Sequence, residues 1–434
     1  MTRTFAERAG RLEQFSWAMY DFASAGYTTV VLTTVYNAFF VAVVAAGAGL
    51  NPATGTLLWT ATVALGNAIV LVTAPVLGAL ADARAAKKRL LLFASVGCIA
   101  ATALLARIGP GEVVSATLLV AVSLVCFESG VNLVSAFLPE LVPTAQIGRM
   151  SGLGWGLGYL GGLATLALCL AYVSAAQARG EPETTFVPMT LLITAAVYGS
   201  ASLPTFAFVR ERAVPPTPAT GSSLLRTAFA RAVATLRQVR ARRDLFRFLV
   251  ALVVFQSGVN TVIVVTAIYA RSQFELGQRE LLLLLMIVHL AAAAGSIVAG
   301  HLQDRFGAVR TLNFALVVWI VALALVASAA SSTQLRVAAI VAGVALGGSQ
   351  SGGRAIVALF TPPARTAEFF GLWGVANRAA SIVGPLTYGF IGAVAGERQR
   401  AAVGVTMLFF VAGLALLRSV DERRGIAMAG DGRS

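Results

Sequence analysis

Residues 78–91 read GALADARAAKKRLL, and residues 300–310 read GHLQDRFGAVR. Glycine, leucine and aspartate keep the same spacing in both stretches, and basic residues follow each of them. The offset from Asp82 to Asp304 is 222 residues. Two further pairs share this offset: Gly162 with Gly384, and Asn132 with Arg354. A long internal repeat of this kind predicts two halves built on one plan.

Long apolar stretches surround both copies. Of the 434 residues, 58% are hydrophobic and 12% are charged, which is typical of a polytopic membrane protein. No charged residue occurs from Phe22 to Ala81, whereas a membrane-spanning helix needs about 20 apolar residues. The long runs exclude a β-barrel, which would need short alternating strands. We predict an all-α membrane protein with twelve spans, near 17–45, 56–80, 90–107, 113–138, 150–176, 186–208, 246–270, 281–301, 311–330, 335–358, 368–395 and 402–418.

The spans fall into two groups of six. Residues 1–208 are predicted to form an N-terminal six-helix bundle, and residues 246–420 a C-terminal one. Residues 209–245 form a linker that is first rich in Pro, Ser and Thr and then interleaves arginines with apolar residues, which indicates an amphipathic basic helix on the membrane surface, although a solvated charged linker is the alternative. Residues 421–434 form a tail.

The net charge of +14 is distributed unevenly across this topology. Of the 33 Lys and Arg residues, 24 fall on one side, 7 on the other and 2 within spans. The positive-inside rule makes the basic side cytoplasmic, with both termini there, in the cell (inner) membrane. We therefore interpret the charge as a topology signal and expect no nucleic-acid partner.

The repeated stretch resembles the signature of the major facilitator superfamily between its second and third helices, Gly-x-Leu-x-Asp-Arg-x-Gly-Arg-Arg/Lys. The resemblance implies a two-bundle transporter that works by alternating access. It also implies that the turns latch the outward-facing state, because a carboxylate at a helix end can cap a neighbouring helix and pair with a nearby arginine. The expected latch residues are Gly78, Asp82, Arg84, Gly300, Asp304 and Arg305.

A narrower resemblance covers most of the chain. SWAMYDFASAGYTTV (16–30), SAFLPEL (135–141) and GGSQSGGRAIVALFTPPARTAEFFGLW (347–373), followed by IVGPL, are similar to the vacuolar amino-acid effluxer-like branch of the superfamily, which includes fungal autophagy-related permeases. This branch suggests export of amino acids. The sequence departs from the usual branch pattern at Ser24, Ser135 and the pair Asn377 and Arg378.

Four charged residues lie well inside the predicted spans, away from the span ends. Asp21 and Glu128 are acidic and belong to the first half, whereas Arg354 and Arg378 are basic and belong to the second. Charges at this depth nearly always face a cavity or one another. They are candidates for binding a zwitterionic substrate or for coupling to protons; the alternatives are a structural Glu128–Arg354 pair and an anchoring role for Asp21. The polar candidates beside them are Asn132, Gln256, Asn260, Gln350 and Asn377.

The residues favour a monomeric, proton-coupled secondary transporter of a small polar or zwitterionic solute. Its expected partners are the small-molecule substrate, protons and membrane lipids. A lysophospholipid or amphiphile translocase and a non-transporting receptor are the alternatives. An enzyme is not expected, because the two histidines and three cysteines form no metal set and no nucleophile–base arrangement. No Walker-type motif occurs and no cofactor is expected.

Overall fold

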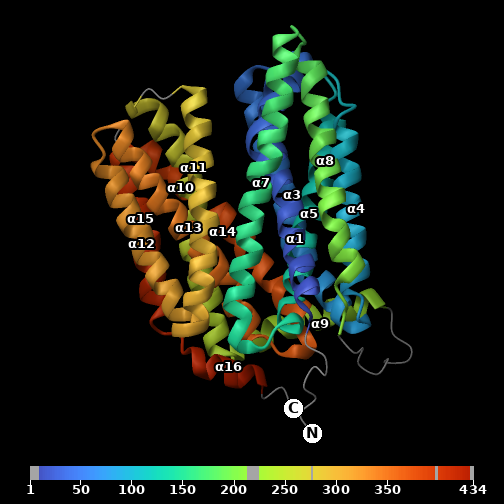
Figure 1. Cartoon of the computed structure of the whole chain (residues 1–434), viewed down its shortest axis with the longest axis vertical. Helices are drawn as coiled ribbons and strands as arrows, with labels where there is room; N and C mark the ends of the chain where they lie inside the picture. The colour runs from blue at the N-terminus through green and yellow to red at the C-terminus, as the bar shows by residue number, and fades with distance from the viewer. Residues whose placement is uncertain (1–8, 213–223, 275–276, 396–398, 431–434) are drawn as a thin grey trace.

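The computed structural model describes residues 9–212, 224–274, 277–395 and 399–430, and these residues form helices joined by short turns. The first eight residues, residues 213–223 of the predicted linker and the last four residues of the predicted tail lie outside the described ranges. Long helices run side by side in Figure 1, and α1 begins at the same end at which α16 finishes. We call this end the termini side.

The first half contains α1 to α8. Helix α1 (Arg11–Tyr27) continues through two π-helical segments, Thr28–Thr34 and Phe40–Ala45, with α2 (Val35–Phe39) between them. The other helices are α3 (Pro52–Arg84), α4 (Lys87–Leu105), α5 (Val113–Ser135), α6 (Leu138–Leu141), α7 (Ile147–Ala178) and α8 (Glu183–Phe208). The second half contains α10 (Arg243–Phe274), α11 (Gln278–Phe306), α12 (Ala308–Ser328), α13 (Ser332–Phe360), α14 (Thr366–Ala395), α15 (Gln399–Leu417) and α16 (Glu422–Gly430), with α9 (Leu224–Ala241) before them.

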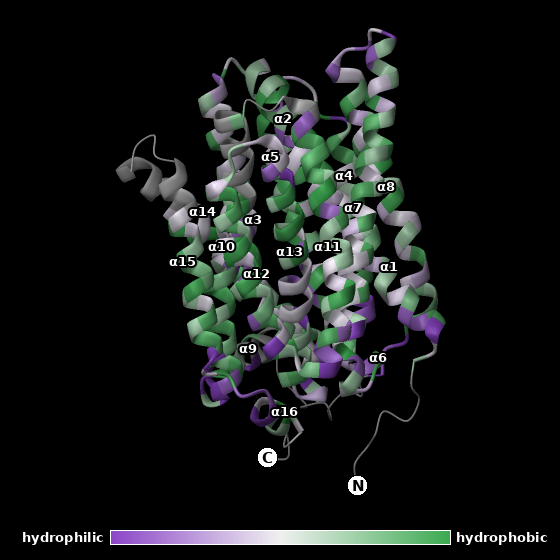
Figure 2. Cartoon of the chain, turned by 60° about the vertical axis from the view of Figure 1, so that its left-hand side comes forward, coloured by the Kyte–Doolittle hydropathy of each residue, from purple (hydrophilic) through white to green (hydrophobic). Residues whose placement is uncertain are grey.

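Each predicted span overlaps one of these helices or, for 17–45, the continuous run from α1 through the second π-helical segment, and the all-α fold is confirmed. Among the described residues, nine helical segments are long and apolar enough to cross a membrane, and a bent pair, α15 with α16, makes a possible tenth. The count of twelve spans stays a prediction. Figure 2 shows why the helices lie in a membrane: hydrophobic residues cover their middles, whereas hydrophilic residues gather at their ends.

Glycines in α7 let three helices approach closely. A Cβ at Gly161 would lie 2.1 Å from the Phe22 carbonyl oxygen in α1. On another face, a Cβ at Gly152 would lie 2.4 Å from the Ser296 carbonyl oxygen in α11. Helix α7 therefore contacts its own half through one set of glycines and the other half through a second set.

The segment after the last helix of the first half closes that half at the termini side. Arg212 Nη1 donates to Glu13 Oε1 at the start of α1 over 2.7 Å. The Glu211 carboxylate accepts the backbone N–H groups of Lys87 and Lys88, at 2.8 and 3.1 Å, and so caps the N-terminus of α4. A negative group is favourable at a helix N-terminus.

The second half repeats this arrangement within the predicted tail. Arg424 Nη2 donates to Asp244 Oδ1 at the start of α10 over 2.6 Å. The Glu422 carboxylate accepts the N–H groups of Ala308 and Val309, at 3.0 and 2.8 Å, and caps α12. The tail from residue 421 thus contains a short helix, α16, that packs beneath its own half.

Each of the two repeated stretches, residues 78–91 and 300–310, which we call the signature stretches, contains one residue with a positive φ angle at the turn between two helices. Ala85 ends α3 with φ 48° and ψ 52°, and Gly307, 222 residues later, has φ 97°. Only glycine adopts such angles without steric cost, so the first turn has alanine where the second has the residue that fits it.

We expect Ala85→Gly to stabilise the chain by about 1 kcal/mol, because it removes the clash of the Cβ with the backbone. Ala83→Gly, inside α3, is the matched control and should destabilise by about 1 kcal/mol. Thermal unfolding of the purified protein in detergent measures both. If both substitutions destabilise the protein equally, the backbone at Ala85 is not strained.

Candidate functional site

Arg354 joins the two halves deep inside the protein. Its side chain is 1% exposed, and its Nη1 donates to Asp21 Oδ2 in α1 over 2.7 Å. Its Nη2 donates to the Ser151 carbonyl oxygen in α7 over 2.9 Å, and its Nε donates to Ser151 Oγ over 3.2 Å. The guanidinium also lies 4.9 and 5.4 Å from the ring centroids of Trp17 and Trp155. All of these partners belong to the first half, so Arg354 is enclosed by it.

Glu128 does not pair with Arg354, the structural pair considered from the sequence. Arg378 Nη1 in α14 donates to Glu128 Oε1 in α5 over 2.8 Å, whereas Arg354 has Asp21. The reason is packing: α14 contacts α3 and α5, and α13 contacts α7. The membrane charges therefore form two ion pairs, and each pair crosses between the halves.

The Arg378 pair differs from the Arg354 pair in having donors left over. Arg378 is 19% exposed and also contacts Asn67 Oδ1 at 3.1 Å, but its Nε has no acceptor among the described residues. The Nδ2 of Asn132, one turn from Glu128 in α5, likewise lacks an acceptor there and lies against Gly374, one turn before Arg378. Buried donors are rarely left unpaired, so this place suits a ligand that accepts hydrogen bonds.

The other predicted polar residues bond within the second half. Gln350 Nε2 donates to Gln256 Oε1 over 3.1 Å and joins α13 to α10. Asn260 Nδ2 donates to Ser381 Oγ over 3.2 Å. Asn377 Nδ2 donates to the Trp373 carbonyl oxygen in its own helix over 2.9 Å. None of these bonds reaches the two ion pairs: the bonds of Gln350 and Asn260 join neighbouring helices, and that of Asn377 stays within α14.

The first signature stretch meets α14 at the termini side. Asp82 Oδ2 accepts the backbone N–H of Glu368, in the first turn of α14, over 2.8 Å. A Cβ at Gly78 would lie 2.2 Å from the Ala367 carbonyl oxygen. Asp82 thus caps a helix of the opposite half, and Gly78 allows the approach.

The second signature stretch meets α7 in the same manner. Asp304 Oδ2 accepts the N–H of Arg149 over 3.2 Å and lies 3.5 Å from its Nε. A Cβ at Gly300 would lie 2.7 Å from the Gly148 carbonyl oxygen. The two halves are therefore in contact at the termini side through both copies of the repeat.

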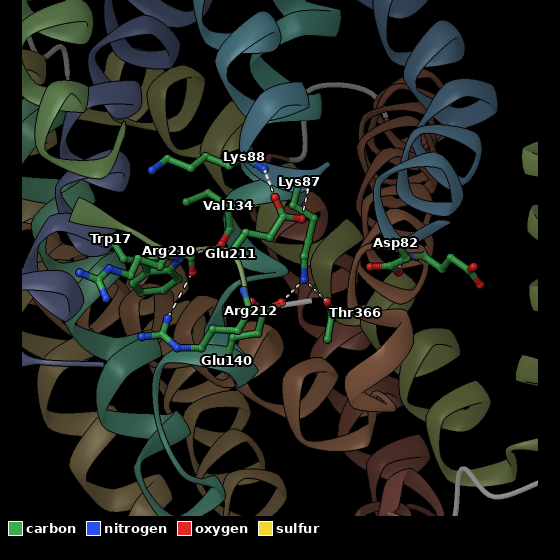
Figure 3. A network of polar contacts seen from close by, with 11 residues as sticks. Trp17, Asp82, Lys87, Lys88, Val134, Glu140, Arg210, Glu211, Arg212 and Thr366 are labelled. Carbon is green, nitrogen blue, oxygen red and sulfur yellow. Dashed lines mark hydrogen bonds and ion pairs between the residues drawn. The ribbon is translucent and has the colours of Figure 1, made fainter. Parts of the chain in front are cut away.

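Arg84 and Arg305 are not the partners of these aspartates. Arg84 is exposed, and the exposed Arg305 guanidinium lies over the Phe306 ring, 5.1 Å from its centroid. Lys87 takes the buried position instead (Figure 3): it forms an ion pair with Glu140, and its Nζ donates to Thr366 Oγ1 over 2.9 Å. Lys87 belongs to the basic cluster that follows Asp82, and no pattern in the sequence indicated that this lysine would be buried.

Glu368 contacts two arginines and one threonine at the termini side. Arg365 Nε donates to Glu368 Oε2 over 2.7 Å, and Thr235 Oγ1 in α9 donates to the same oxygen over 2.6 Å. Arg231 Nε lies 3.4 Å from Glu368 Oε1. The predicted basic helix is thus bonded to α14, and Figure 1 shows it at the termini side.

Solved structures with a similar arrangement include a transporter of the major facilitator superfamily. The human organic anion transporter MFSD10 has a TM-score of 0.72 at 14% identity, over 94% of this chain and 99% of that one. The proton:xylose symporter XylE has a TM-score of 0.70 at 14% identity, over 95% and 96%. A bacterial homologue of ferroportin in an outward-facing state has a TM-score of 0.67 at 13% identity, over 94% and 99%. The chain therefore has the major facilitator fold.

Sequence comparison places the chain within that superfamily. The family model described as "Vacuole effluxer Atg22 like" matches residues 56–430, and the chain belongs to this family. It is 29% identical over 413 residues to the uncharacterized MFS-type transporter YxiO of Bacillus subtilis, covering 94% of this chain and 95% of that one. It is 23% identical over 313 residues to autophagy-related protein 22-1 of Sclerotinia sclerotiorum, covering 65% of this chain and 52% of that one. It is thus a multi-pass membrane protein of a transporter family.

Proposed function

We propose that this chain is a secondary transporter that moves an amino-acid-like zwitterion, outward as the family description suggests, by alternating access. The proposal rests on the two ion pairs between the halves, Asp21 with Arg354 and Glu128 with Arg378. In each of them the acid belongs to the first half and the arginine to the second. A zwitterion presents the same two charges to such a site. Binding of the zwitterion would replace one ion pair within the protein by two ion pairs between the protein and the substrate.

Arg378 is the better of the two arginines for the substrate carboxylate. Its Nε is unpaired among the described residues and its side chain is partly exposed, whereas every nitrogen of Arg354 has a partner. The substrate ammonium group would face Glu128. Arg354 then serves as a gate, because its contacts with α1 and α7 must break before the termini side opens.

Contacts at the termini side support the alternating-access part of the proposal. Asp82, Lys87 and Asp304 all contact the opposite half there. We assign the basic termini side to the cytoplasm, so that the contacts there would close the cytoplasmic side of a monomer in the inner membrane, as in an outward-facing state. The outward-facing ferroportin homologue has a similar fold.

Binding tests the substrate class directly. Each of the twenty amino acids is added to the purified protein, and the thermal unfolding midpoint is followed, since a ligand at 100 times its Kd adds about 2.7 kcal/mol of stability. The methyl ester and the N-acetyl derivative of the best amino acid should both lose the effect, because each lacks one of the two charges. Stabilisation by lysophospholipid and by no amino acid would favour the translocase alternative.

Substituting the two arginines by lysine should separate their roles. Arg378→Lys is expected to weaken amino-acid binding by at least about tenfold, because an ammonium cannot bind a carboxylate in the bidentate manner of a guanidinium. Arg354→Lys is expected to change affinity less and to loosen the termini side. Titration calorimetry gives the affinities. The opposite ranking would exclude Arg378 as the carboxylate site.

Proton coupling is assigned to Glu128, with Asp21 as the second candidate. Protonation of Glu128 would release Arg378, so the proton and the substrate ammonium compete for one carboxylate. Glu128→Gln is expected to abolish the response of amino-acid flux to a pH gradient in proteoliposomes. Asp21→Asn is the comparison variant. A full pH response in Glu128→Gln together with none in Asp21→Asn would move the coupling to Asp21.

A further inference from the structure

A cavity of about 660 Å³ lies at the termini side where α1, α7 and α11 meet. Its walls come from both halves, because α1 and α7 belong to the first half and α11 to the second. The substrate site proposed above involves none of its lining residues. Figure 1 shows these three helices together in the lower part of the molecule.

One part of the cavity is basic. Arg11, Arg149 and His301 line it, and no Asp or Glu is among its lining residues. Arg149 Nε lies 3.5 Å from Asp304, but half of the Arg149 side chain remains exposed. Arg11 makes no hydrogen bond or ion pair with the described residues, so its charge is available to a ligand. The cavity therefore suits an anion.

Another part of the cavity is apolar and continues onto the lipid-facing surface. Phe15 and Ile297 line it and are 50% and 38% exposed. Their neighbours Leu12 and Val298 are 58% and 57% exposed. In a membrane protein such side chains are covered by acyl chains, and arginines at helix ends lie at the level of the headgroups.

We propose that this cavity binds the headgroup of an anionic phospholipid from the leaflet on the termini side. The phosphate lies between Arg11 and Arg149, and the acyl chains run along Phe15 and Ile297. A free anion would use only the basic part of this cavity, whereas a phospholipid uses both. Because the walls come from both halves, a bound lipid holds the termini side closed.

Native mass spectrometry of the full chain in detergent tests this proposal. Phosphatidylglycerol and phosphatidylcholine with the same acyl chains are titrated separately, and inorganic phosphate is the soluble comparison. One phosphatidylglycerol molecule is expected to bind about tenfold more tightly than phosphatidylcholine. Arg11→Gln and Arg149→Gln should each weaken it about fivefold, as for one basic residue at an anionic membrane surface.

Arg89→Gln is the matched control, because Arg89 is exposed at the same end and does not line the cavity. It should leave lipid binding unchanged. Arg11→Gln keeps the proposal testable if Arg149→Gln disturbs the contact with Asp304. Phosphatidylglycerol affinity unchanged in the double variant, or equal for phosphatidylcholine, would overturn the proposal. The proposal would also be overturned if inorganic phosphate displaced the lipid at a concentration equal to the Kd of phosphate. The cavity would then be a site for free anions.

Discussion

Gly152→Leu is expected to hold the halves apart at the termini side while each half stays folded. The new Cβ would lie 2.4 Å from the Ser296 carbonyl oxygen, and backbone in a packed helix cannot yield. Overpacking of this kind costs about 1–3 kcal/mol or more, which shifts a two-state equilibrium by about fivefold to more than a hundredfold. Since the clash lies between the halves, separation of the halves relieves it.

Spin labels at Ala145 and Arg310, both exposed and one in each half, measure the result in a cysteine-free background. The distance between them should increase in Gly152→Leu. Gly161→Leu is the matched control in the same helix: its Cβ would lie 2.1 Å from the Phe22 carbonyl oxygen within the first half, so it should unfold the protein. An unchanged distance in a folded Gly152→Leu protein would contradict the proposed opening.

Removal of the Lys87 ammonium should cause the largest loss of stability of any charge substitution at the closure. Lys87 and Glu140 are both fully buried, so Lys87→Met strands a buried carboxylate, at a cost of about 3–5 kcal/mol. The double variant Lys87→Met with Glu140→Gln should recover most of this loss, because no charge is then left unpaired. Arg84→Met, at an exposed position, is the control and should change stability by less than about 0.5 kcal/mol.

Thermal unfolding of the four proteins gives the comparison. Lys87 also donates to Thr366 in the second half, so Lys87→Met should increase the distance between the labelled halves as well. If the double variant is as unstable as Lys87→Met alone, the ion pair is not the source of the loss.

The fold was predictable because its signals repeat along the chain. Apolar runs identify helices, and the Gly-x-Leu-x-Asp stretch at an offset of 222 residues indicates two halves. The contacts between the halves at Asp82 and Asp304 follow from the same stretch, since each carboxylate accepts a backbone N–H of the opposite half. A local pattern suffices for these positions, because a carboxylate at a helix end has few roles.

The pairing of charges was not predictable in the same way. Sequence shows that Asp21, Glu128, Arg354 and Arg378 lie in spans, but which acid meets which arginine depends on how α13 and α14 pack. The burial of Lys87 and the helix α16 were missed for a related reason. A lysine in a basic cluster and a short charged segment after the last span have the composition of solvated surface, and only tertiary contacts bury or order them.

Exchange of amino acids across a membrane tests the central claim most directly. Proteoliposomes loaded with all twenty amino acids are diluted into buffer, with and without a pH gradient, and the contents that leave are identified by mass spectrometry. We predict that a small set of amino acids leaves faster from wild-type vesicles than from protein-free vesicles, and that Arg378→Lys abolishes the difference while remaining folded. Equal release of every amino acid from wild-type and protein-free vesicles, under both gradients, would contradict the account.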